Sequence, residues 1–187
     1  LKTYEVGINA VQNLDQISLI NSTLADLSRE TGRVAQFSVE DNNQVLCVQS
    51  IGQKAPSFSV YTNVGRRSPL YCTSAGKAIL STYSNNEIID KWEKFDVKPL
   101  TEHTITDIHA LLQDISEVKQ RHYALDREEN EYNIFCVGAL VMNYTNTPLG
   151  AISISGTTLT QEEEQTISQT LTAAVKRLSA TLGYVMR

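Results

Sequence analysis

Hydrophobic residues recur every three or four positions near the start of the chain, which indicates an amphipathic helix. Asn13 is suited to the N-cap of this helix, Gln16 to the matching capping-box position, and Gly32 to its C-terminal end. The apolar stripe consists of Leu14, Ile17, Ile20, Leu24 and Leu27.

The hydrophobic period then changes to two, which is typical of strands. Apolar and polar residues alternate over 35–39, the residues Asp41, Asn42 and Asn43 have turn chemistry, and 45–48 is a short apolar run. This pattern predicts a β-hairpin. Phe58 and its neighbour Val60 suggest a third strand, which ends at Gly65.

Three helices are predicted next. The first spans 73–82 and begins with small residues, the second begins at a Ser84–Glu87 capping box, and the third begins near Thr106. Their buried faces are expected to carry Ile88, Ile89, Trp92 and Phe95 in the second helix and Ile108, Leu111, Ile115 and Val118 in the third.

Strands return in the last third of the chain. The pattern predicts an edge strand over 123–128 and two strands, 134–143 and 149–155, joined by a turn. A final helix begins at Thr160 and runs to about Tyr184. Helices at both ends and a mostly antiparallel sheet predict an α+β fold, organised as a single domain over 1–187.

Composition narrows the functional classes. The 187 residues include 16 basic and 21 acidic side chains, so the net charge of −5 argues against direct nucleic-acid binding. No apolar run is long enough to cross a bilayer and no signal peptide is visible, so we expect a soluble, cytoplasmic protein without membrane partners. Because the chain opens with Leu1 rather than Met, we expect it to be part of something longer.

Enzyme and metal signatures are mostly missing from the sequence. No nucleotide-binding, zinc-protease or nucleophile-elbow motif occurs, and no cofactor is indicated. The histidines show no metal-ligand spacing and the cysteines no CxxC spacing; these residues are His103, His109, His122, Cys47, Cys72 and Cys136. A Cys–His nucleophilic pair stays open, since such partners can be far apart in sequence.

Two serines stand where a strand is expected to be apolar. Ser153 and Ser155 share one face of their strand, and Ile134, Cys136 and Gly138 share a face of the neighbouring strand. If both faces of the sheet are covered, the hydroxyls lie inside and need partners. We expect Gly138 to leave space beside them for a ligand. The alternative is that each serine bonds nearby backbone.

Two further features could complete a site. The small residues Ser74, Ala75 and Gly76 at a helix start leave backbone N–H groups open to an anion, with Lys77 either adding charge or lying in solvent. In the acidic run, three carboxylates are expected in solvent and one facing a ligand hydroxyl, while the ligand's own carboxylate points to the helix start. This run comprises Asp126, Glu128, Glu129 and Glu131.

Taken together, these segments resemble the effector-binding domain of IclR-family bacterial transcriptional regulators. The motifs that carry the resemblance are 65–77 (GRRSPLYCTSAGK), 104–106 (TIT), 126–131 (DREENE) with Cys136, and 153–156 (SISG). The first of these looks most like regulators of 2-keto-3-deoxygluconate and hexuronate use. The resemblance implies a GAF-like fold, a small organic acid as effector, a homodimer or homotetramer, and DNA contact only through an N-terminal winged helix-turn-helix domain outside these residues. It also implies a set of ligand contacts, with Ile134 as an apolar wall: Ser74, Ala75, Asp126, Ile134, Cys136, Ser153 and Ser155.

Three functions therefore remain open at the level of sequence. The leading hypothesis is a sensor of a 2-keto acid or sugar acid that is not an enzyme. The second is a GAF-like enzyme with Cys136 or Cys72 as nucleophile, which requires a thiol pKa well below its usual value. The third is a structural assembly module without a pocket.

Overall fold

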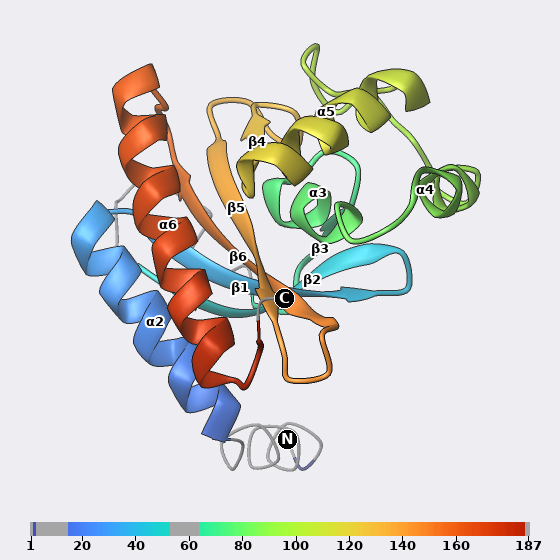
Figure 1. The fold of residues 1–187 in the computed structure, drawn as a ribbon. Helices are drawn as coiled ribbons and strands as arrows, with labels where there is room; N and C mark the ends of the chain where they lie inside the picture. Colours follow the sequence, from blue (N-terminus) through green and yellow to red (C-terminus); the bar gives the residue numbers. More distant parts are fainter. Residues whose placement is uncertain (1, 3–14, 53–63, 186–187) are drawn as a thin grey trace.

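The computed structural model describes residue 2, residues 15–52 and residues 64–185. Within them, one helix, three strands, three helices, three strands and a last helix follow one another in an α+β arrangement (Figure 1). In chain order these elements are α2 (Asp15–Thr31), β1 (Val34–Asp41), β2 (Gln44–Ile51), β3 (Arg67–Pro69), α3 (Ser74–Leu80), α4 (Asn85–Trp92), α5 (Ile108–Arg121), β4 (Ala124–Arg127), β5 (Phe135–Met142), β6 (Pro148–Gly156) and α6 (Gln161–Thr181).

The strands form one antiparallel sheet in the order β3-β2-β1-β6-β5-β4. The β1–β2 hairpin turns at Asn42 and Asn43, which both have positive φ angles of 54° and 60°, a combination that two-residue hairpin turns favour. β6 lies between β1 and β5 and is therefore central. This places the two predicted hairpins side by side in the sheet.

Helices cover both faces of the sheet, so its central strands are buried on both sides. α2 and α6 lie next to one another on one face, and α3, α4 and α5 lie on the other (Figure 1). On β6, Ile152 and Ile154 belong to the core under α2 and α6, while Ala151 belongs to the core under α3. The interior is therefore two apolar layers separated by the sheet.

Capping chemistry sets the ends of several helices as the sequence predicted. Capping boxes begin α4 at Ser84 and α6 at Thr160, and Gly32, with a φ of +66°, follows α2. Asp107 caps α5, one residue after the predicted Thr106. α6 ends at Thr181 rather than near Tyr184.

The structure corrects the predicted burial of Ile89 and the predicted end of the third strand, and it does not describe most of that strand. Ile89 is 39% exposed rather than buried, because α4 packs through Ile88 and through Trp92, whose ring meets the Tyr71 ring edge-on at 5.7 Å. β3 begins at Arg67, after the predicted end at Gly65. The rest of that predicted strand, with Phe58 and Val60, lies outside the described residues, as do Asn13 and Leu14.

Candidate effector-binding site

The polar face of β6 carries the two serines that the alternation predicted. Ser153 and Ser155 are each 5% exposed and lie on the α3 side of the sheet. In the β5–β6 pairing Cys136 stands opposite Ser155 and Gly138 opposite Ser153. The prediction that both hydroxyls lie inside the domain, beside this face of β5, is confirmed.

The two hydroxyls differ in their partners. The Cys136 thiol donates to Ser155 Oγ over 3.2 Å. Within the described residues, the Ser153 hydroxyl has no hydrogen-bond partner. The Ser153 hydroxyl is therefore available as a donor and an acceptor to a guest.

The start of α3 faces the same strands. Thr73 is the N-cap: its Oγ1 accepts from Gly76 N over 3.2 Å and its carbonyl accepts from Lys77 N over 2.8 Å. Within the described part of the chain, the N–H groups of Ser74 and Ala75 have no acceptor. Because α3 has only seven residues, these local N–H groups matter more than any helix dipole.

Gly138 brings α3 against the sheet rather than leaving an empty space. A Cβ at this position would lie 2.6 Å from the carbonyl carbon of Ser74 and 2.9 Å from Ala75 N. The expectation of free space at Gly138 is therefore wrong, because the first turn of α3 fills it. The same contact fixes Ser74 and Ala75 next to Ser153.

Asp126 is the acid of the 126–131 run that faces these groups. It is 2% exposed, and its Oδ1 accepts from Glu129 N at 2.8 Å and from Asn130 N at 3.4 Å. Its Oδ2 has no hydrogen-bond partner among the described residues. Burial, followed by the nearby Glu129 charge, raises the pKa of Asp126 to about 7. The carboxyl can therefore act as acceptor or donor near neutral pH.

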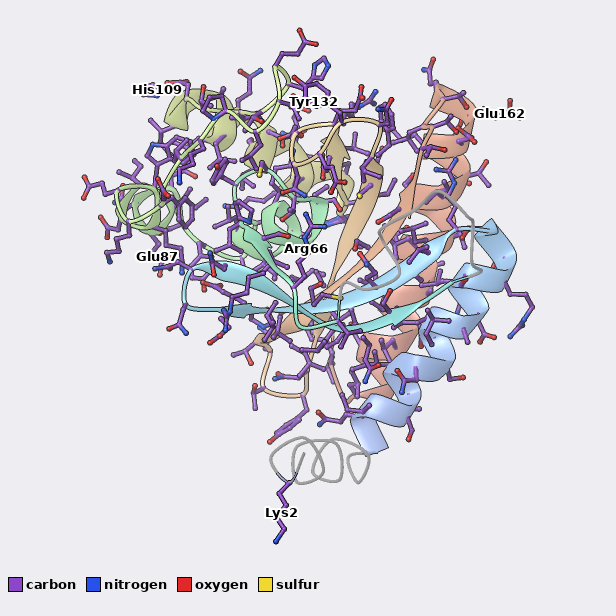
Figure 2. The ribbon with its side chains drawn as sticks, turned by 180° about the vertical axis from the view of Figure 1, so that it is seen from behind. Lys2, Arg66, Glu87, His109, Tyr132 and Glu162 are labelled. Carbon is purple, nitrogen blue, oxygen red and sulfur yellow. The ribbon has the colours of Figure 1, made fainter. Side chains whose placement is uncertain are left out.

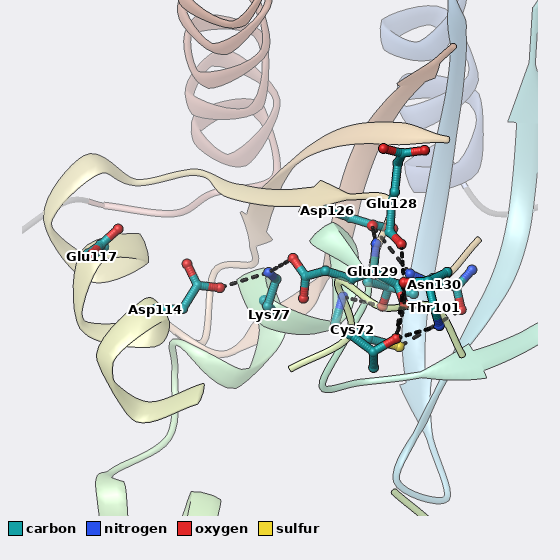
Figure 3. Close-up of polar contacts among 12 residues, drawn as sticks. Cys72, Lys77, Thr101, Asp114, Glu117, Asp126, Glu128, Glu129 and Asn130 are labelled. Carbon is teal, nitrogen blue, oxygen red and sulfur yellow. Dashed lines mark hydrogen bonds and ion pairs between the residues drawn. The ribbon is translucent and has the colours of Figure 1, made fainter. Parts of the chain in front are cut away.

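Lys77 is buried, contrary to the expectation of a solvated side chain. Its Nζ lies 2.5 Å from Glu129 Oε1 and 2.7 Å from Asp114 Oδ2 (Figure 3). Burial alone lowers the pKa of Lys77, but Glu129 and Asp114 raise it above its usual value. Glu129 is only 6% exposed, so fewer than the expected three acids of the run lie in solvent. These ion pairs tie α3, α5 and the 126–131 loop together.

One cavity of about 80 Å³ joins these elements. This exceeds the roughly 30 Å³ of one water in the liquid but is well below the ~300–1,000 Å³ of drug-sized ligand pockets, so the cavity suits a small guest. All seven residues of the predicted contact set line it, namely Ser74, Ala75, Asp126, Ile134, Cys136, Ser153 and Ser155. The structure thus brings together residues that are up to 81 positions apart in the chain.

A protein-family model described as "Bacterial transcriptional regulator IclR C-terminal" matches residues 8–180. The chain belongs to the IclR family. Within that family it corresponds to the C-terminal, effector-binding domain, and its α+β architecture is the GAF-like fold of that domain.

Individual IclR-family proteins agree over nearly the whole chain. The HTH-type transcriptional regulator KdgR of Escherichia coli K12 is 32% identical over 98% of this chain and 70% of its own length. The solved C-terminal domain of E. coli KdgR matches with a TM-score of 0.81 and 28% identity, over 91% of this chain and all of that one. IclR of Thermotoga maritima matches with a TM-score of 0.87 and 28% identity, over 98% of this chain and 74% of that one. A double mutant of the PobR inducer-binding domain of Acinetobacter, solved with 3-hydroxybenzoic acid, matches with a TM-score of 0.76 and 26% identity, over 89% of this chain and 98% of that one.

The IclR domain also places residues in the cavity that the sequence did not single out. Gln36 and Ser38 stand two apart on β1, with Gln36 opposite Ser153 in the β1–β6 pairing. Their polar alternation in an apolar strand is the same signal that identified the serines of β6. At the rim, Arg66 pairs with Glu131 over 3.3 Å (Figure 2 labels Arg66). No local pattern predicts that contact across 65 positions.

The thiols of this IclR domain bear on the enzyme hypothesis. Burial raises the pKa of Cys136, which lines the cavity, and that of Cys72. A cysteine nucleophile needs the opposite shift, because the thiolate is the reactive form. The histidines lie apart from the cavity, with His109 at the outer edge of the molecule in Figure 2. Among the described residues, no group of three potential ligands could hold a metal ion, and no helix could span a membrane.

Proposed function

We propose that the cavity binds a small organic acid, of the 2-keto acid or sugar acid class, as the effector of a transcriptional regulator. The observation that carries this proposal is the Ser153 hydroxyl, which lines the cavity and has no hydrogen-bond partner in the described part of the chain. A guest oxygen would supply the missing partner.

The guest would lie between donors and an acid. Its carboxylate would accept from the N–H groups of Ser74 and Ala75 and from the Ser153 hydroxyl. Its hydroxylated end would face Asp126, whose Oδ2 lacks a protein partner. Ile134 would cover an apolar part of the guest, and Cys136 would hold the Ser155 hydroxyl in place.

The KdgR likeness supports the sugar-acid branch of this class, because the identity to KdgR extends over 98% of the chain. The double mutant of the PobR domain, solved with a hydroxylated aromatic acid, supports the broader class of organic acids. A regulator of this kind would meet a metabolite in the cytoplasm and contact DNA through an N-terminal helix-turn-helix domain, as a homodimer or homotetramer.

Effector binding would reach the DNA-binding part through β1 and α2. β1 contributes Gln36 and Ser38 to the cavity, and only two residues, Gly32 and Arg33, separate α2 from β1. A guest can shift the regulator only by the difference in its affinity for two states, which is typically about 1–3 kcal/mol. That difference would arise where β1 lines the cavity.

A thermal-shift panel of 2-keto acids and sugar acids, followed by calorimetry, tests the proposal. A true effector stabilises the fold by mass action. Ser153→Ala should weaken its binding about 10- to 150-fold, because a hydrogen bond to a charged group is worth roughly 1.5–3 kcal/mol. Ser168→Ala is the matched control, since Ser168 is equally buried but lies in α6 outside the cavity. If no acid of the panel stabilises the protein, the proposal fails.

A further inference from the structure

A second concavity, a groove of about 580 Å³, lies beside the end of β5 and shares no lining residue with the cavity. β4 pairs only with 135–138 of β5, so among the described residues no strand lies on the β4 side of 139–142, whose other side pairs with β6. α6 forms one wall of the groove and the ends of α3 and α5 form the other. The groove therefore occupies the open edge of the sheet, between the two helical layers.

The floor of the groove is apolar and fixed. Leu140 and Met142 of β5 lie between Val118 of α5 and Val175 of α6. Met142 N donates to Ser179 Oγ over 3.0 Å, which attaches the end of β5 to α6. Because this contact closes the gap between strand and helix, the groove has a defined base.

The charge around this floor has one sign. Lys119 and Lys176 line the groove, while no Asp or Glu does, although acids outnumber bases by 21 to 16 in the chain. The Lys119 ammonium donates to the Tyr83 carbonyl over 2.8 Å. Lys176 is exposed, and within the described part of the chain no hydrogen bond or ion pair holds its ammonium. An anionic group would complement these two lysines.

We propose that this groove binds an apolar monocarboxylate, with its hydrocarbon part on Leu140, Met142 and Val175 and its carboxylate facing Lys176. The volume falls within the ~300–1,000 Å³ of small-molecule sites, which are mainly apolar with a few polar groups that set orientation. This site goes beyond the proposed effector cavity and does not depend on it.

Methionine-methyl NMR with decanoate as the probe tests the proposal on the whole chain. The sequence holds only two methionines, Met142 and Met186, so ¹³C-methyl labelling gives two signals, and Met142→Leu assigns them. We expect a saturable shift of the Met142 signal with decanoate, and a much weaker response to decanol and to decyltrimethylammonium. The Ser153→Ala variant should bind decanoate unchanged, which separates this test from that of the cavity.

Two variants test whether Lys176 attracts the carboxylate and whether the groove holds the hydrocarbon part of decanoate. Lys176→Glu replaces an attraction with a repulsion at an exposed position and should weaken decanoate binding about 2- to 30-fold, whereas Lys94→Glu on the α4 side should not. Thr172→Trp should fill the groove and remove the saturable shift.

Three results would overturn the proposal: no Met142 shift at millimolar decanoate, equal response to decanol, or equal affinity in the Lys176→Glu variant. A Met142 signal that depends on protein concentration without any acid, and loses this dependence in Thr172→Trp, would assign the groove to a second copy of the chain instead.

Discussion

Asp126 should make the stability of this domain depend on pH in a way that a single substitution removes. In the folded protein its pKa is raised from an ordinary 3.8 to about 7 by burial and by Glu129. Well below pH 4 the carboxyl is protonated in both the folded and the unfolded chain, so its pKa shift has no effect on stability. As the pH rises from 4 to 7, the unfolded chain releases this proton and the folded chain keeps it, so folding stability falls. Above pH 7 the loss is complete and constant.

The size of the effect follows from the same shift. Because a tenfold change in proton affinity corresponds to about 1.36 kcal/mol, the full loss is on the order of 4 kcal/mol. Asp126→Asn keeps a side-chain oxygen that can accept from the N–H groups of Glu129 and Asn130 but has no proton to release. Its free energy of unfolding, relative to that of the wild type, should therefore increase steadily between pH 4 and pH 7.

Urea unfolding at several pH values from 4.5 to 8 measures this difference. The control is Asp90→Asn at an exposed position of α4, whose unfolding free energy should follow the wild type throughout. Parallel curves for Asp126→Asn and the wild type would refute the assignment of a buried, proton-binding carboxyl at the cavity.

Three substitutions probe the packing around the cavity. Lys77→Met leaves Glu129 buried without a cation, while Asp114 keeps Arg121, and should cost about 3–5 kcal/mol, lowering Tm by roughly 6–20 °C. Lys94→Met should stay within about 0.5 kcal/mol of the wild type, and a loss below about 1 kcal/mol for Lys77→Met would contradict the buried ion pairs. Gly138→Ala places a methyl group against the backbone of α3 and should cost about 1–3 kcal/mol in urea unfolding, so a neutral result would contradict that close approach. Without ligand, Ser153→Ala should keep the Tm of the wild type, because the hydroxyl has no partner among the described residues. Ser155→Ala should lower the Tm slightly, because it removes the acceptor of the Cys136 thiol. A lower Tm for Ser153→Ala than for Ser155→Ala would show that Ser153 is structural.

Hydrophobic–polar alternation and helix-capping residues predicted most of the strands and helices. The polar face of β6 was predicted because every second residue of a strand points to the same side. The starts of α4 and α6 were predicted because Ser84 and Thr160 each have a glutamate three residues later. Both signals are local, so a single sequence reveals them. All seven predicted cavity residues do meet at one cavity, although their role as ligand contacts remains a prediction.

The features that the sequence did not predict depend on residues far away along the chain. Lys77 looks like any lysine near a helix start, and its burial follows only from Glu129, 52 positions away, and from Asp114 on α5. The close contact at Gly138 likewise depends on where α3 packs. By contrast, Gln36 and Ser38 could have been found, because their spacing on β1 repeats that of Ser153 and Ser155.

Calorimetric titration of 2-keto-3-deoxygluconate, side by side into the wild type, Ser153→Ala and Ser168→Ala, tests the central claim most directly. The account predicts saturable binding to the wild type and to Ser168→Ala, and an affinity about 10- to 150-fold lower for Ser153→Ala. Equal affinity in all three proteins would contradict it, since the acid would then bind without the hydroxyl that the fold encloses unpaired.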